Sequence, residues 1–174
     1  MISGTLSRRA LITFAVALSI GALGSTPIAH ADPIPSGIHT WSGDNYDGLG
    51  GGRSGSQSTA AGHEFDAFAS FDHRVISVTV YQSPDESWGL DFVAPKGQVL
   101  AEGRYEGAVH PNIGISDRPG LNVQPPWGTS SDITGTFTVT DVSFGEGQKV
   151  ESFEVSYVQD REGFEPLTGE LRVG

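Results

Sequence analysis

The chain has 174 residues and no cysteine, which excludes a disulfide framework, a thiolate metal site and a cysteine nucleophile. It carries 21 acidic and 10 basic residues, giving a formal net charge of −11. An acidic surface repels phosphate backbones and anionic lipid headgroups, so we expect neither nucleic-acid binding nor membrane binding. A solvated acidic coat that keeps an exported protein soluble is the simplest interpretation of this charge.

Residues 1–31 have the pattern of an export signal. Arg8-Arg9 gives a positive segment, an apolar run covers 10–23, and Ala29-His30-Ala31 offers small residues to a signal peptidase. The apolar run is too short for a transmembrane helix. The paired arginines resemble a twin-arginine export signal, with ordinary Sec export as the alternative. We therefore expect a secreted, extracellular bacterial protein with one domain over 32–174, in which eight basic and 21 acidic residues give a charge of −13.

A glycine-rich segment follows the first predicted strand, which covers Ile38 to Trp41. Six glycines fall among the fourteen residues from Ser42 to Gly55, so this segment predicts a mobile turn. Asp44 and Asp47 carry oxygen ligands of the kind that Ca²⁺ binds. The EF-hand spacing is absent, however, and no glutamate closes the loop. We expect a turn capped by Asp and Asn side chains, with no metal.

The middle of the chain predicts a series of short strands separated by turns. Apolar and polar residues alternate in most of these segments, as a half-buried antiparallel sheet requires. Trp88 and Phe92 fall on one face of their strand and should be buried together. The expected segments are 63–71, 75–81, 88–92, a strand beginning at 99–100, 103–108 and a brief pairing at 121–123.

The last forty residues give the strongest strand pattern. Residues 135–142, 150–159 and 167–173 alternate with a period of two, which places Phe153 and Tyr157 on one face. No segment after the export signal has a helical period. The pattern predicts an all-β fold, an antiparallel β-sandwich of jelly-roll or immunoglobulin-like type with about eight or nine strands.

Several turns and core aromatics follow one another in a characteristic order along the chain. They are Asp47–Gly52, Trp88–Gly97, Leu100, Gly103, Tyr105, Ala108, Pro119–Leu121, Gly135–Val139, Phe153 and Leu167–Gly169. In this order they resemble an uncharacterised family of secreted bacterial β-sandwich proteins. Members of that family usually carry two cysteines, whose places are taken here by 128–132 and 157–160. The resemblance implies a fold and export, and it implies no activity.

Motifs that would indicate a metal, a nucleophile or a cofactor are absent from the sequence. The histidines of the predicted domain, His39, His63, His73 and His110, have no zinc-type spacing, so we expect exposed turn histidines. Gly52-Arg53-Ser54-Gly55 misses the Gly-x-Ser-x-Gly hydrolase motif by one position. No glycine-rich loop precedes a helix, so we expect no phosphate-binding cofactor. We assign no catalytic, cofactor-binding or metal residue.

Two function classes stay open. The first is a non-catalytic surface module that binds a cell-wall polymer, a glycan or an extracellular protein, with Trp41, Tyr46 and Trp127 as loop aromatics that could stack on a sugar. The alternative is a small secreted hydrolase, similar to a glycosidase, that uses a carboxylate pair such as Glu102/Glu106 or Asp85/Glu86. We favour the first, because acidic pairs must arise by chance among 21 acidic residues.

Overall fold

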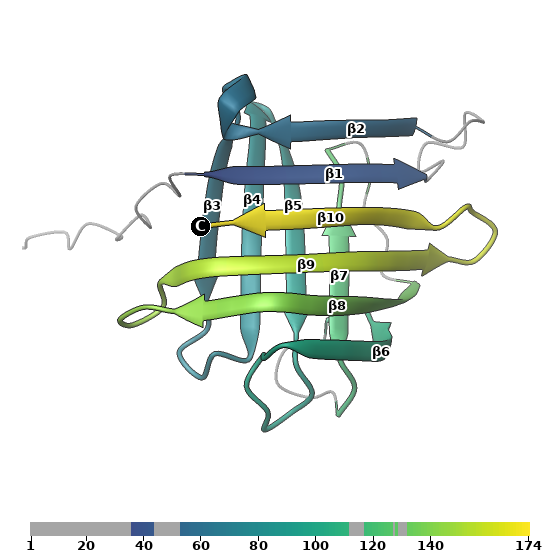
Figure 1. The fold of residues 1–174 in the computed structure, drawn as a ribbon. Helices are drawn as coiled ribbons and strands as arrows, with labels where there is room; N and C mark the ends of the chain where they lie inside the picture. The colour runs from purple at the N-terminus through teal and green to yellow at the C-terminus, as the bar shows by residue number, and fades with distance from the viewer. Residues whose placement is uncertain (1–35, 44–52, 112–116, 127, 129–131) are drawn as a thin grey trace, which may run out of the picture.

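The computed structural model describes residues 36–43, 53–111, 117–126, 128 and 132–174 (Figure 1). The predicted export signal and most of the predicted glycine-rich turn, 44–52, lie outside this part of the chain. Within the described ranges, no helix is long and apolar enough to cross a membrane. The helix that they contain is the short 3₁₀ turn η1 (Thr59–Ala61).

The predicted all-β class is confirmed. The structure forms a ten-stranded sheet in the order β2-β1-β10-β9-β8-β6-β7-β5-β4-β3, in which β6 and β7 pair in parallel and the other neighbours are antiparallel. The strands are β1 (Gly37–Gly43), β2 (Arg53–Ser58), β3 (Glu64–Ala69), β4 (Val75–Ser83), β5 (Glu86–Val93), β6 (Gly103–Val109), β7 (Gly120–Gln124), β8 (Ile133–Phe144), β9 (Val150–Arg161) and β10 (Leu167–Val173).

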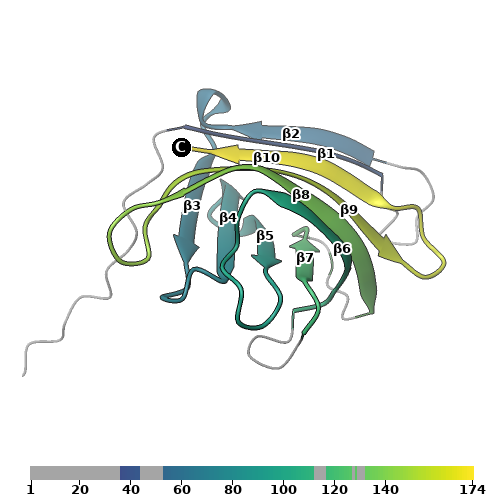
Figure 2. The same ribbon diagram turned by 60° about the horizontal axis from the view of Figure 1, so that its bottom comes forward.

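This sheet folds over itself into two layers (Figures 1 and 2). The large layer contains β2, β1, β10, β9, β8 and β6, and the small layer contains β7, β5, β4 and β3. Figure 1 shows the strands of one layer running across those of the other. The layers are continuous at one side, where Val109 of β6 pairs with Gly120 of β7. At another side, Phe68 of β3 bridges to Lys149 in the β8–β9 turn.

The core lies between the two layers, where the inward residues of both alternating patterns meet. The prediction that Trp88, Phe92, Phe153 and Tyr157 are buried is confirmed. Phe92 of β5 packs edge-on against Phe137 and Phe153 of the large layer, with ring centroids 5.4 Å apart in both pairs. Edge-to-face contacts of this kind add to the hydrophobic stabilisation that burial gives.

Glycines on the inner face of the large layer make room for large rings. The Trp41 ring lies over Gly55, where a Cβ would stand only 2.8 Å from Trp41 Cζ2. A Cβ at Gly169 would collide with the Tyr157 ring and the Thr40 carbonyl. These close approaches explain why glycine occurs inside β2 and β10, where it otherwise weakens a strand.

Three predicted boundaries are wrong. β2 begins at Arg53, so the end of the glycine-rich segment is a strand, paired with β1 from Gly43↔Arg53 onward. Val99 and Leu100 form no strand, although Leu100 is buried and its N–H donates to the His73 carbonyl at 2.9 Å. β3 ends at Ala69, which leaves Phe71 in a turn with 84% of its surface exposed. In each case the strand boundary depends on pairing with distant strands, which the local alternation of apolar and polar residues does not reveal.

Candidate binding face

The aromatics proposed from the sequence as loop platforms do not form a site in the described structure. Trp41 lies within β1, faces the core and retains 9% exposure, so its prediction as a loop aromatic is wrong. Its ring packs against Trp88 with centroids 4.9 Å apart. Tyr46 and Trp127 lie outside the described residues.

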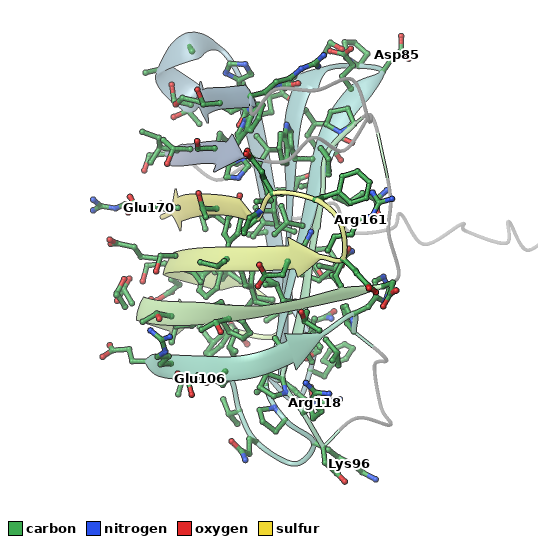
Figure 3. The ribbon with its side chains drawn as sticks, turned by 90° about the vertical axis from the view of Figure 1, so that its right-hand side faces the viewer. Asp85, Lys96, Glu106, Arg118, Arg161 and Glu170 are labelled. Carbon is green, nitrogen blue, oxygen red and sulfur yellow. The ribbon has the colours of Figure 1, made fainter. Side chains whose placement is uncertain are left out.

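The two carboxylate pairs named from the sequence do not form a cleft. Glu106 is exposed and forms a salt bridge with Arg104, with 2.8 Å between Nε and Oε1. Asp85 and Glu86 are exposed at the β4–β5 turn. Figure 3 shows Asp85 and Glu106 at opposite ends of the molecule. Neither pair has the enclosed geometry that a glycosidase needs.

His39 is fully buried, so its prediction as an exposed turn histidine is wrong. Gln57 Oε1 can only accept, so His39 Nδ1 donates to it at 2.9 Å. His39 Nε2 is then the unprotonated nitrogen, and it accepts from the Tyr157 hydroxyl at 2.8 Å. The imidazole also lies edge-on to Trp88, with ring centroids 5.0 Å apart. Both ring nitrogens are satisfied, so the group is a structural polar network inside the core.

Burial sets the protonation state of this network. Desolvation lowers the pKa of His39 from 6.5 to about 4, and the hydrogen bond that His39 donates to Gln57 opposes this effect. Desolvation also raises the pKa of the Tyr157 hydroxyl above its ordinary value. Both side chains are therefore neutral at physiological pH and closed off from solvent. They belong to the core between the two layers.

The outward residues of the large layer, called here the large face, are rich in hydroxyl groups. They include Ser54, Ser56 and Ser58 in β2, Thr40 and Ser42 in β1, Thr168, Glu170 and Arg172 in β10, Glu154, Ser156 and Val158 in β9, Thr134, Thr136, Thr138 and Thr140 in β8, and Arg104 and Glu106 in β6. Its acidic and basic residues are neighbours: Arg172 pairs in register with Glu154. Figure 3 shows Glu106 and Glu170 projecting from this layer, away from the small layer.

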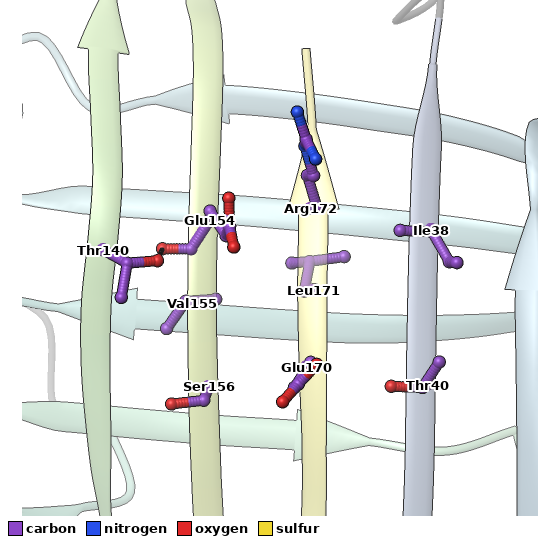
Figure 4. Close-up of a pocket in the computed structure, with 9 residues that line it drawn as sticks. All are labelled: Ile38, Thr40, Thr140, Glu154, Val155, Ser156, Glu170, Leu171 and Arg172. Carbon is purple, nitrogen blue, oxygen red and sulfur yellow. Dashed lines mark hydrogen bonds between the residues drawn. The ribbon is translucent and has the colours of Figure 1, made fainter.

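A shallow hollow of about 340 Å³ lies on the large face over β1, β10, β9 and β8 (Figure 4). Glu154, Glu170 and Arg172 line it, together with the hydroxyls of Thr40 and Ser156. The three charged side chains are exposed. The hollow could accept a small polar group, but it has no aromatic wall and no buried polar group aimed into it.

The outward residues of the small layer, called here the small face, combine aromatic rings with hydrogen-bonding groups. They are Glu64, Asp66 and Phe68 in β3, Ser77, Thr79 and Tyr81 in β4, Ser87, Gly89 and Asp91 in β5, and Asn122 and Gln124 in β7. Phe68 and Tyr81 retain 47% and 37% exposure. The register places Phe68 opposite Ser77 and Tyr81 opposite Glu64, so the two rings occupy separate ends of the β3–β4 pair.

A carboxylate with fixed orientation lies on the same face. The Ser77 hydroxyl donates to Asp91 Oδ1 at 2.6 Å, and the Asn122 amide donates to Oδ2 at 3.1 Å. These residues come from β4, β5 and β7, and the register aligns Ser77 with Asp91 and Asp91 with Asn122. Each contact is a charge-assisted or polar hydrogen bond that holds the carboxylate in place before any ligand arrives.

The middle of the small face is open. Gly89 lies between Thr79 and Gln124 in the register. A Cβ built at this glycine would meet nothing within 4 Å. The absence of a side chain there leaves a gap on the surface between the two aromatic residues and Asp91. The small face is therefore the described surface that best combines stacking, hydrogen bonding and free space.

The described residues contain no group of three or more His, Asp or Glu side chains that could hold a metal ion. A comparison of the chain with protein-family models gives no match, and comparisons with curated proteins and with solved structures give none either. The candidate site therefore depends on the geometry and chemistry of the small face alone.

Proposed function

We propose that this protein is a secreted, non-catalytic binding module that recognises a glycan of a cell wall or cell surface through its small face. One observation carries the proposal: exposed Phe68 and Tyr81 share a sheet face with Asp91, whose carboxylate is fixed by Ser77 and Asn122. A sugar presents an apolar ring face and a rim of hydroxyl groups. Aromatic rings suit the first, and oriented carboxylate and amide groups suit the second.

The spacing of the rings favours an extended ligand. Tyr81 lies four residues along β4 from Ser77, which is the register partner of Phe68. At the usual rise of a strand, the two aromatic positions are separated by about 13 Å along the sheet. A ligand that contacts both must therefore be an oligomer. The open surface at Gly89 lies within that span.

A pull-down with polysaccharides and cell-wall preparations tests the proposal, using purified protein expressed from the full-length sequence. Wild type should be retained, while Phe68→Ala and Tyr81→Ala should reduce retention. Phe71→Ala is the matched control, because Phe71 is the more exposed aromatic and lies in the β3–β4 turn outside the small face. Equal retention of all three variants would contradict the proposal.

A glycosidase-like hydrolase is the alternative, and the hollow of the large face gives it one supporting observation. Glu154 and Glu170 lie on neighbouring strands and line the same hollow (Figure 4). The register makes them diagonal neighbours, a relation that places Cα atoms about 7–8 Å apart. Both are exposed, however, and a general acid usually needs a desolvated pocket to keep its proton. Glycan hydrolysis that disappears in Glu154→Gln or Glu170→Gln would favour this alternative.

A further inference from the structure

The outward strand positions of the small face carry carboxylates and no basic residue, and Lys149 of the β8–β9 turn bridges to Phe68 at the border of this face. Glu64, Asp66 and Asp91 all occupy outward positions, and none of the outward positions of β3, β4, β5 and β7 is Lys or Arg. The large face differs, because Arg104 is bonded to Glu106 there and Arg172 is opposite Glu154. The outward positions of the large face also hold more acidic than basic residues, but some of those carboxylates have arginine partners, whereas the small face has no arginine at its outward positions.

The arginines at the border of this layer are engaged elsewhere. Arg74 is buried, and its Nε donates to the Ala94 carbonyl at 2.8 Å. Arg118 donates from Nη2 to the Gly107 carbonyl at 2.6 Å. Both side chains therefore donate hydrogen bonds to backbone carbonyls near the end of the small layer. Neither occupies a position between the two aromatic rings.

The aromatic rings of the small face favour a positively charged ligand, as its carboxylates do. The face of an aromatic ring attracts a cation through its quadrupole, and a Tyr or Phe ring within about 6 Å of an ammonium stabilises it. Phe68 and Tyr81 are both exposed enough to contact a ligand. Rings and carboxylates together suit a ligand that has apolar surfaces, hydroxyl groups and positive charge.

Asp91 retains capacity to accept more hydrogen bonds. An ionised carboxylate offers about four lone-pair positions. Ser77 and Asn122 use one contact each, on different oxygens. The remaining positions can accept from an ammonium group, which donates three hydrogen bonds and accepts none. Neither Ser77 nor Asn122 supplies a positive charge, so the charge of the carboxylate is left for a ligand to balance.

We propose that the small face binds a polysaccharide whose sugars carry free, protonated amino groups, with the amines placed at its carboxylates and the sugar rings on Phe68 and Tyr81. This inference rests on the proposed function, since it specifies the glycan that the same face would take. The uncharged polar groups of the face, such as Thr79 and Gln124, suit the hydroxyl groups of the sugars. An anionic polysaccharide is excluded by repulsion from three carboxylates.

The test compares oligomers of one sugar that differ only in charge. Binding of the purified protein, expressed from the full-length sequence, to a glucosamine hexamer and to its fully N-acetylated counterpart is measured by calorimetry at mildly acidic pH. The amine-bearing hexamer should bind about tenfold more tightly or better, equivalent to about 1.4 kcal/mol. Its advantage should shrink as salt is raised, because salt screens exposed charges.

Two substitutions separate charge from shape. Asp91→Asn keeps the size of the side chain and removes its charge, so it should remove most of the preference for the amine. Gly89→Val adds a side chain to the gap, where a Cβ meets no neighbour within 4 Å, so it should block both hexamers. Asp160→Asn, at an exposed position of β9 on the large face, is the matched control for a lost charge and should change neither affinity. Thermal melting of each variant shows whether the fold is retained.

Each result distinguishes the amine preference from glycan binding itself. Equal affinity for the two hexamers, or tighter binding of the N-acetylated one, overturns the amine inference and leaves glycan binding in place. Failure of both hexamers and of every polysaccharide in the pull-down overturns the proposed function as well. An oligolysine peptide that binds as tightly as the amine-bearing hexamer, and loses binding in Asp91→Asn, would show a cationic peptide to be the ligand and also overturn the inference.

Discussion

The two outer faces of this protein cover the same core but differ in chemistry. The large face carries rows of Ser and Thr, with some of its acidic residues next to arginines and no aromatic residue at the outward positions of its described strands. The small face carries two exposed aromatics, three carboxylates and no basic residue at its outward positions. Period-two alternation requires only that outward residues tolerate water. The additional features of the small face therefore point to a ligand.

One core supports both faces. Removing a core residue that contacts both layers should therefore lower the stability of the protein more than any other change considered below. Phe92 contacts Phe137 and Phe153 across the layers. Phe92→Ala should lower the free energy of unfolding by about 3–5 kcal/mol, from lost burial and the cavity left behind. Chemical denaturation measures this loss in a single transition. Phe153→Ala should give a similar loss, and Phe71→Ala, at an exposed site, should change stability by less than about 0.5 kcal/mol.

The layers also differ in their inner chemistry, because the large layer carries the buried His39 network. The unfolded pKa of 6.5 exceeds the folded pKa of about 4, so the unfolded chain binds the additional proton between these values. Stability contributed by neutral His39 is complete above pH 6.5 and is lost as the pH falls toward 4. The difference between the two pKa values is equivalent to about 3 kcal/mol.

Denaturation at several pH values between 7 and 4 measures this loss. His39→Gln should lower stability at pH 7 and reduce its decline on acidification, because the titrating group is gone. The Asp72 carboxyl, whose pKa is lowered mainly by the hydrogen bond from Ser70, titrates below this window and should not obscure it. A wild-type stability that is flat between pH 6.5 and 4.5 would contradict the assignment of a buried, neutral His39.

Exchanging an aromatic between the faces sharpens the comparison of binding. Tyr81→Ala should weaken glycan binding by about tenfold, equivalent to about 1.4 kcal/mol. The double variant Tyr81→Ala, Thr138→Tyr moves a ring to the large face and should not restore binding, because no carboxylate held like Asp91 by Ser and Asn side chains accompanies it there. Calorimetry with the same oligosaccharide measures both. Restoration of binding by Thr138→Tyr would show that any exposed ring suffices.

The smallest effect is expected from calcium. Asp44 and Asp47 offer two carboxylates in a glycine-rich segment, whereas Ca²⁺ takes six to eight oxygen ligands. The double variant Asp44→Asn, Asp47→Asn should keep its stability within about one kcal/mol of wild type, with or without calcium. A melting temperature that rises by several degrees with millimolar Ca²⁺, and only in wild type, would establish a third binding region at this segment.

The sequence predicted the inward residues well because alternation depends on local spacing alone. Trp88, Phe92, Phe153 and Tyr157 were all assigned to the core from their period. The same alternation places Asp66 and Phe68 on the outward side of β3. What alternation cannot report is which strands become neighbours, and β5 pairs with β7 although the β6 strand lies between them in the chain.

The candidate site depends on which strands become neighbours. Asp91 meets Ser77 through the β4–β5 hairpin, which the turn after Ser83 makes predictable, but it meets Asn122 only through the β5–β7 pairing. The burial of His39 was missed for a related reason. Its short strand is flanked by glycine and proline, and its polar partners Gln57 and Tyr157 lie 18 and 118 residues away. Long-range contacts of this kind leave no local pattern.

The position of β10 in the sheet limits the order in which the fold can assemble. β10 lies between β1 and β9, with Gly37 opposite Val173, and the Gly174 N–H donates to the Ser36 carbonyl at 3.1 Å. Until residues 167–173 arrive, β1 and β2 can pair only with each other and have no hydrogen-bonded route to the rest of the sheet. A partial chain therefore exposes the inner surface of Trp41 and His39. Closure joins residues more than 120 positions apart, so folding should be slow, as it is for other sheets built from distant pairings.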